Sequence, residues 1–148
     1  DVQWTSDAWL LKFEGVTVDQ SGDTFVSSVA GFEYTFFDVA ESGIDVGLLA
    51  EGLYDSRDES ETALTLFEND IFAGTRITWN DVQESALFLG AIVDWETGST
   101  FGSVEYERRI SDNMKFEVEA QYLTAQDSEP LAQVERDSNL TFRLTRYF

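Results

Sequence analysis

Two pairs of glutamates are the residues of this sequence whose spacing comes closest to catalytic chemistry. Glu105 and Glu107 lie in "SVEYERR", and Glu117 and Glu119 lie in "MKFEVEAQ", so neighbouring strands would bring four carboxyl groups together. Glycosidases use such pairs. The chain has no His and no Cys, which removes a Ser-His-Asp triad and a thiolate nucleophile. We therefore expect a salt-bridged charged surface and no enzymatic activity.

The sequence predicts no metal or cofactor either. Its densest acidic run, from Asp55 to Glu61, reads "DSRDESE" and lacks the Asp-x-Asp-x-Asp-Gly spacing of a high-affinity calcium loop. Dinucleotide-binding glycine patterns are absent from the sequence. We expect this run to be a solvated loop that repels like-charged surfaces.

Length and composition fit one domain over residues 1–148, with 43% hydrophobic residues and a formal charge of −20. Nine Lys and Arg against 29 Asp and Glu make nucleic acid an unfavourable partner. No apolar run approaches the roughly 18 residues of a membrane helix. Hydropathy alone would suggest a soluble protein, but membrane β-barrels escape such scans.

The dominant hydrophobic period is two, which indicates β-strands. In "MKFEVEAQYL", for example, Met114, Phe116 and Val118 share one parity, and Lys115 and Glu117 share the other. We predict eight strands, joined by alternating shorter and longer connections. Their expected ranges are 5–16, 24–37, 43–54, 70–79, 85–95, 101–110, 114–123 and 139–148.

An antiparallel up-and-down β-barrel would close such a sheet and remove its edges. A soluble barrel turns its apolar face inward, whereas a transmembrane barrel turns it toward lipid. The polar parity carries charges of both signs, which favours the transmembrane form with a paired charge network in its lumen. The expected network consists of Lys12, Glu14, Glu33, Glu51, Arg76, Asp94, Glu105, Glu107, Arg109, Lys115, Glu117, Glu119 and Arg143.

Aromatic residues gather near the predicted strand ends. Trp9, Trp79 and Phe148 would lie at the short-turn end of the sheet, and Tyr54, Trp95 and Tyr122 would lie at the end with longer loops. Such a distribution is typical of the two interfacial girdles of a membrane barrel, although aromatics also cap soluble barrels.

The closing segment "NLTFRLTRYF" resembles the C-terminal signal strand of bacterial outer-membrane barrels. Leu140, Phe142 and Leu144 alternate toward the terminal Phe148. The resemblance implies that the barrel assembly machinery recognises this strand and its last aromatic residue. Arg146 departs from the pattern, because it occupies the apolar parity. At a strand end its side chain could reach the membrane interface.

A broader resemblance covers most of the chain. The segments "GFEYTFF", "LLAEGLYDSRD", "FENDIFAGTRITWNDVQ", "IVDWETGSTFGSVEYERRISDNMKFEVEA" and "LTRYF" are similar to the C-terminal portion of an uncharacterised family of proteobacterial outer-membrane proteins. Members tend to have further strands ahead of this region. The resemblance implies a bacterial outer-membrane location and leaves open a chain that is part of a larger barrel. It implies no reaction and no ligand.

The sequence thus favours a non-enzymatic outer-membrane β-barrel with a side-chain-filled lumen and a structural or surface-interaction role. Its expected partners are outer-membrane lipid and the barrel assembly machinery, with the oligomeric state left open. Two alternatives stand beside it. A larger barrel would make the acidic face the lining of a cation-favouring, porin-like channel, and a soluble barrel would bind a small apolar ligand inside.

Overall fold

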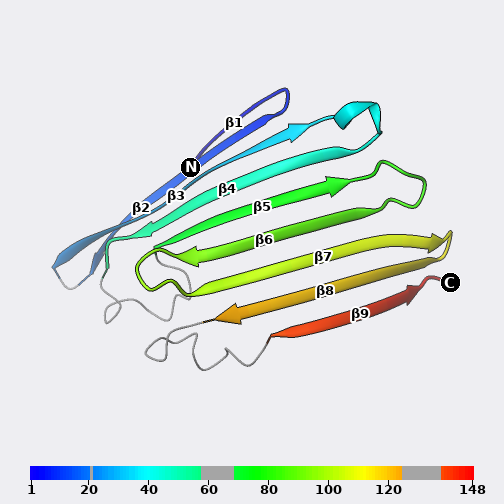
Figure 1. The fold of residues 1–148 in the computed structure, drawn as a ribbon. Coiled ribbons are helices and arrows are strands. Elements are labelled where there is room, and N and C mark those ends of the chain that lie inside the picture. Colours follow the sequence, from blue (N-terminus) through cyan, green and yellow to red (C-terminus); the bar gives the residue numbers. More distant parts are fainter. Residues whose placement is uncertain (21, 58–68, 125–137) are drawn as a thin grey trace.

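The computed structural model describes residues 1–20, 22–57, 69–124 and 138–148, which form a single antiparallel sheet of nine strands. Each strand pairs with the next one in the sequence, so the sheet is an up-and-down meander (Figure 1). The strands are β1 (Val2–Ser6), β2 (Trp9–Gln20), β3 (Asp23–Phe36), β4 (Asp45–Asp55), β5 (Asp70–Thr78), β6 (Ala86–Asp94), β7 (Thr100–Ser111), β8 (Met114–Thr124) and β9 (Asn139–Arg146).

A short 3-10 turn, Val39–Glu41, lies in the β3–β4 connection. Within the described ranges there is no helix long and apolar enough to cross a membrane. The predicted all-β antiparallel class is confirmed, and seven of the expected strands lie within two residues of their predicted bounds.

The expected strand over 5–16 is wrong, because two strands occupy that region. β1 and β2 form a tight hairpin in which Ser6 pairs with Trp9, and Asp7 takes a left-handed conformation with φ of 47°. The turn contains neither Gly nor Pro, so the usual sequence signal is missing. Asp is one of the few residues that tolerate this conformation.

The β2–β3 connection is also shorter than the sequence suggested. β2 continues to Gln20 and β3 starts at Asp23, so most of the expected loop "TVDQSGD" extends the two strands. Gly22 supplies the positive φ, at 100°, that a tight turn requires. The size contrast between the two ends of the sheet is therefore weaker than predicted.

The expected barrel closure is not present in the described residues. β1 and β9 lie at opposite edges of the open sheet (Figure 1). Since every ladder is antiparallel, strand directions alternate, and β1 and β9 run the same way. The additional hairpin at the start makes the strand number odd. Joining β1 directly to β9 would therefore create a parallel ladder, unlike every other ladder in this sheet.

Register carries one apolar face across all nine strands. For example, Leu48 is aligned through Thr75 with Leu89, and Leu89 pairs with Val104. Side chains that share this face across the sheet include Leu11, Phe32, Tyr34, Leu48, Leu87, Leu89, Val93, Val118 and Phe142. We call this side of the sheet the apolar face and the other side the charged face.

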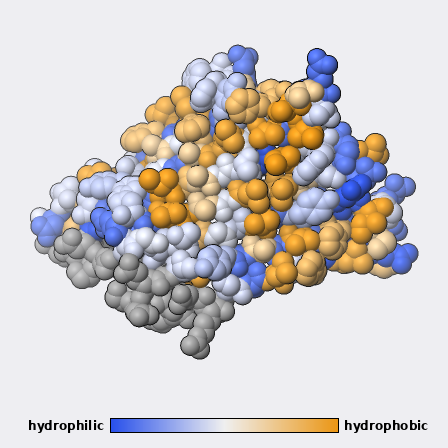
Figure 2. All heavy atoms as spheres, viewed as in Figure 1, coloured by the Kyte–Doolittle hydropathy of each residue, from blue (hydrophilic) through white to orange (hydrophobic). Residues whose placement is uncertain are grey.

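The described sheet has no enclosed apolar core, and the shielding of side chains on its charged face is partial. Large apolar side chains are exposed, with Phe13 at 53% and Phe142 at 64%, and Leu123 is the one buried hydrophobic residue among those described. On the charged face, Glu51 and Glu33 are only 24% and 28% exposed. Hydrophobic side chains accordingly spread over the molecular surface instead of being enclosed between layers (Figure 2).

Candidate functional site: the charged face

Two ion pairs on the charged face each reach across an intervening strand. Lys12 of β2 binds Glu51 of β4 above Gly31 of β3. The Arg76 guanidinium of β5 lies 3.6 Å from a carboxylate oxygen of Glu33 in β3, with β4 between them. Second-neighbour strands are about 9.6 Å apart, so only long side chains can meet across them. These pairs tie β2, β3, β4 and β5 together beyond their backbone ladders.

Glycines make room for these contacts. A Cβ on Gly31 would lie 2.7 Å from Cγ of Glu51 and 2.9 Å from the carbonyl oxygen of Ala50. At Gly47, under the Glu33–Arg76 pair, the nearest atoms are Glu33 Oε1 and Arg76 Cβ at 3.7 and 3.8 Å. The absence of a side chain at Gly31 lets Glu51 cover the backbone there, whereas a Cβ at Gly47 would meet its neighbours at ordinary van der Waals distances.

Glycines also make room for two phenylalanines in the middle of the charged face. Phe72 and Phe88 stack with ring centroids 6.4 Å apart, and they lie over the paired glycines Gly74 and Gly90. A Cβ on Gly74 would approach the Phe72 ring to 2.8 Å. The charged face therefore contains an aromatic patch that parity alone does not reveal.

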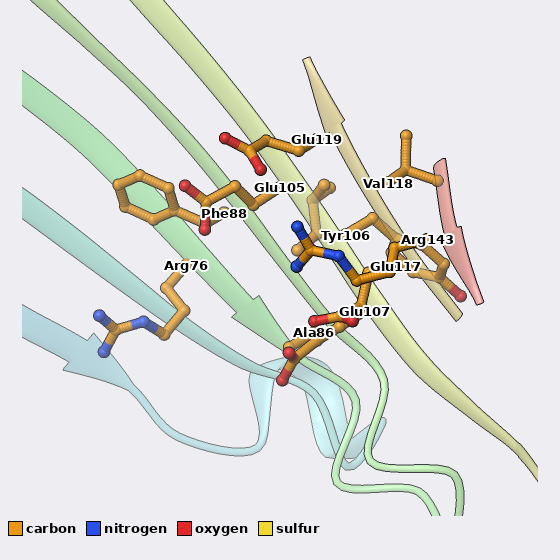
Figure 3. A pocket seen from close by; sticks show the side chains of 11 residues that line it. Arg76, Ala86, Phe88, Glu105, Tyr106, Glu107, Glu117, Val118, Glu119 and Arg143 are labelled. Carbon is orange, nitrogen blue, oxygen red and sulfur yellow. The ribbon is translucent and has the colours of Figure 1, made fainter. Parts of the chain in front are cut away.

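A groove of about 430 Å³ runs over the part of the charged face formed by β5 to β9. Figure 3 shows side chains from five strands projecting around it. Charged residues that line it are Arg76, Glu105, Glu107, Glu117, Glu119 and Arg143. The two glutamate pairs of the sequence thus come together here, as expected, with arginines on both sides of them.

The four glutamates form two directly opposed pairs in the β7–β8 ladder, Glu105 with Glu119 and Glu107 with Glu117. Like charges placed directly opposite each other repel. Lys115 offsets part of this repulsion, because its ammonium lies 2.7 Å from Glu107 and 3.2 Å from Glu117.

The remaining carboxylates of this group bind polar neighbours. Gln121 donates a 2.6 Å hydrogen bond to Glu119, and the Ser103 hydroxyl donates to Glu105 at 3.4 Å. Arg143 is aligned with Glu117 in the β8–β9 ladder but has no ion pair among the described residues.

Besides Arg143, which has no ion pair among the described residues, three further members of the expected charge network behave differently from the prediction. Arg109 pairs with Glu84 at 3.0 Å, and Glu84 belongs to the β5–β6 turn, not to the predicted network. The backbone N–H of Arg109 also donates to the carbonyl of Gln83, because the end of β7 runs alongside that turn. Asp94 accepts hydrogen bonds from the N–H groups of Glu96 and Thr97, so it stabilises a turn. Glu14 has no ion pair within the described part of the chain.

An additional ion pair lies at the long-loop end of β4. Arg57 donates two side-chain hydrogen bonds, of 2.9 and 2.6 Å, to the two oxygens of Asp55, and both side chains are largely buried. Asp55 begins the acidic run for which we expected a solvated loop. The rest of that run, residues 58–61, lies outside the described residues.

Aromatic residues occupy the strand ends. Trp9, Trp79 and Phe148 lie at the short-turn end, beside β2, β5 and β9. Tyr54, Trp95 and Tyr122 lie at the other end, beside β4, β6 and β8. At the short-turn end of the apolar face, the ring of Trp9 is 4.5 Å from Tyr34 and 6.1 Å from Phe32.

The closing strand β9 has β8 as its single described neighbour, with Phe142 opposite Val118 and Leu144 opposite Phe116. Leu140, Phe142 and Leu144 all lie on the apolar face and are exposed, and Phe148 is fully exposed beyond the strand end. The edge of β9 away from β8 therefore has exposed apolar side chains and no strand beside it among the described residues.

Sequence reasoning identified most of the charged residues but missed the turn residue Glu84 and the covered glycines. The glycines did carry a signal, because Gly31, Gly47, Gly74 and Gly90 all have the parity of the charged face. A glycine in a strand often marks the close approach of another group. Strand parity places these glycines on the charged face, but it does not identify the side chain that packs against each of them.

No family model, curated protein or solved structure matches this chain. Among the described residues, no group of three or more His, Cys, Asp or Glu could hold a metal ion. The geometry of the two faces is therefore the basis for a functional proposal.

The crowding over Gly31 leads to a first prediction. Gly31→Ala should lower the free energy of unfolding by about 1–3 kcal/mol, since the new Cβ clashes with backbone and side-chain atoms of β4. Gly52→Ala is the matched control, because a Cβ at Gly52 has no atom within 4 Å. Urea titration of the refolded protein measures both values. Equal midpoints for the two variants would show that Gly31 is not a close-approach position.

The ion pairs of Arg57 and Arg109 lead to a second prediction. Arg57→Met should destabilise the protein by about 1–3 kcal/mol, since it leaves the largely buried Asp55 without its charged partner. Arg109→Met should cost less than about 1 kcal/mol, because that pair is half-exposed. Chemical denaturation of both variants provides the comparison. A larger loss for Arg109→Met would contradict this ranking.

Proposed function

We propose that this chain is a non-enzymatic bacterial outer-membrane β-barrel protein with a structural or surface-interaction role. One observation carries the proposal: large apolar side chains are exposed on one face, and the other face carries charges of both signs that pair across strands. In water such an arrangement would leave most of the hydrophobic driving force unused. In a bilayer the apolar face contacts lipid and the charged face lines the interior.

The internal contacts support this orientation. Ion pairs that reach over a neighbouring strand, Lys12–Glu51 and Arg76–Glu33, occur on the charged face. Side chains meet across an intervening strand most easily on the concave side of a sheet. Charged groups enclosed by such curvature need partners, and these pairs supply them.

Both ends of the sheet support a membrane position as well. Tyr and Trp prefer the level of the lipid headgroups, and here aromatic residues lie near the strand ends, while the centres of β4 and β6 on the apolar face are aliphatic or small. The exposed alternation of β9 and the terminal Phe148 resemble the strand that the barrel assembly machinery recognises. Lipid and that machinery are accordingly the proposed partners.

Barrel closure has to satisfy strand direction. β9 and β2 run antiparallel, so eight strands from β2 to β9 could close with every ladder antiparallel, in agreement with the even strand numbers of bacterial barrels. Eight strands leave an interior that side chains fill. In that form the charged groove becomes a packed lumen, without an open pore.

The open sheet favours a second candidate, in which further strands complete a larger barrel. The groove over β5 to β9 would then line a water-filled channel, and its four glutamates would favour cations. Conductance of the protein in planar bilayers distinguishes the two forms. A filled lumen gives no steady channels, whereas a larger barrel conducts potassium better than chloride.

The orientation of the faces is tested with spin labels. The chain contains no cysteine, so single cysteines can be introduced without background labelling. In bilayers, labels at Leu48, Leu89 and Phe142 should be more accessible to oxygen than to a soluble nickel complex. Control labels at Ser103 and Thr141, on the charged face, should show the reverse. A preference for nickel at the first three positions would favour the soluble barrel that binds an apolar ligand.

The recognition role of Phe148 gives a further test. Deleting it should strongly reduce assembly in cells but change refolding from urea into detergent only modestly, by about 1–2 kcal/mol of lost apolar burial. Heat-modifiable protein in outer-membrane fractions is compared with refolding yield, for the deletion and for Phe148→Leu. Intact cellular assembly of the deletion variant would leave Phe148 with a packing role only.

A further inference from the structure

Two arginines interrupt the apolar face, and both lie at its short-turn end. Arg108 of β7 is aligned with Phe116 of β8, and Arg146 of β9 is aligned with Met114 one row further toward the turn. β8 separates them. Both side chains are exposed.

These arginines have no ion pair among the described residues, although the chain carries a charge of −20. Five other described cations are paired with carboxylates, namely Lys12, Arg57, Arg76, Arg109 and Lys115. Arg143 is unpaired too, but it lies on the charged face opposite Glu117. Arg108 and Arg146 therefore lie on the face of the sheet opposite to most of the acidic side chains.

The surroundings of the two guanidinium groups contain little negative charge. By strand parity, Asp19 is the one acid of the described strands on the apolar face, and it lies near the tip of the β2–β3 hairpin at the opposite end. Asp81, in the β5–β6 turn, accepts hydrogen bonds from the backbone N–H and hydroxyl of Ser85. Those bonds, with a smaller effect of Arg108, lower the pKa of Asp81. Arg146 lies over the ring of Phe148, 5.2 Å from its centroid.

An arginine at the lipid-facing end of a strand brings its guanidinium to the level of the headgroups while its stem stays in the apolar layer. Guanidinium groups bind phosphate through two parallel hydrogen bonds, which makes arginine a suitable ligand for phosphodiesters. The long-loop end of the apolar face has no Lys or Arg among the described residues. Among the described residues, the basic side chains of the apolar face therefore lie at one end of the sheet.

We propose that Arg108 and Arg146 bind the phosphate groups of anionic phospholipids in the leaflet at the short-turn end. This inference rests on the proposed function, because it requires the apolar face to lie in a bilayer. It adds a lipid class and two ligand residues to that function. The basic side chains then compensate for a protein whose overall charge would otherwise repel an anionic membrane surface.

The test uses the full chain inserted into vesicles that contain phosphatidylcholine and phosphatidylglycerol. Spin-labelled lipids report the association of each headgroup with the protein. The wild type should select phosphatidylglycerol, and Arg108→Gln/Arg146→Gln should lose about fivefold of this selectivity per arginine at low salt. The control Arg109→Gln/Arg143→Gln removes two charges from the same strands but from the charged face, and it should retain the preference.

Each outcome separates the two proposals. An inserted wild type without selectivity overturns the inference and leaves the proposed function intact. An equal loss in both double variants also overturns it, because net charge would then explain the preference. Failure of the wild type to insert into any bilayer contradicts the proposed function and this inference together.

Discussion

Antiparallel register is the constraint on which both faces of this sheet depend. Side chains alternate along a strand, so a slip of one residue in any ladder would move a whole strand's apolar set to the charged face. The eight consecutive ladders keep the same parity except for a register shift between Arg109 and Ser111 at the end of the β7–β8 ladder. The row from Leu48 through Leu89 to Leu140 crosses six strands without a charged residue. No second layer of secondary structure packs on the described sheet. The register therefore determines which side chains face each environment, and the environment of each face in turn favours that register.

Long side chains are more crowded on the charged face than on the apolar face. Long side chains such as Lys12 and Arg76 have to converge with carboxylates from non-adjacent strands. Gly31, beneath the Lys12–Glu51 contact, lacks a Cβ that would clash with Glu51, and Gly74 and Gly90 accommodate the stacked pair Phe72 and Phe88. The side chains of the charged face therefore pack as one layer, which contains the ion pairs, the stacked phenylalanines and the glycines, although these residues come from several strands.

Much of the fold follows from the sequence, because the period of two is clear over β3 to β9. The β1–β2 turn was not predictable, since Asp7 adopts its left-handed conformation without the Gly or Pro that usually marks a turn. In the charged network, parity identified the face of Arg109 but not its partner. That partner is Glu84, and the pairing depends on how far β7 extends past the β5–β6 turn. Face is a local property of a strand, whereas ion pairing depends on several side chains and on the curvature of the sheet.

The opposed glutamates of the β7–β8 ladder have a consequence for the order of folding. An isolated hairpin of these two strands would bring Glu105 against Glu119 and Glu107 against Glu117, with Lys115 as the main internal counter-charge. Local closure by the short turn is therefore opposed by repulsion at its own centre. Arg76 arrives from β5 and Arg143 from β9, so the hairpin gains its remaining positive neighbours only when strands on both sides are in place. Formation of this ladder is thereby coupled to late, longer-range contacts, which slows nucleation there and makes the sheet more cooperative.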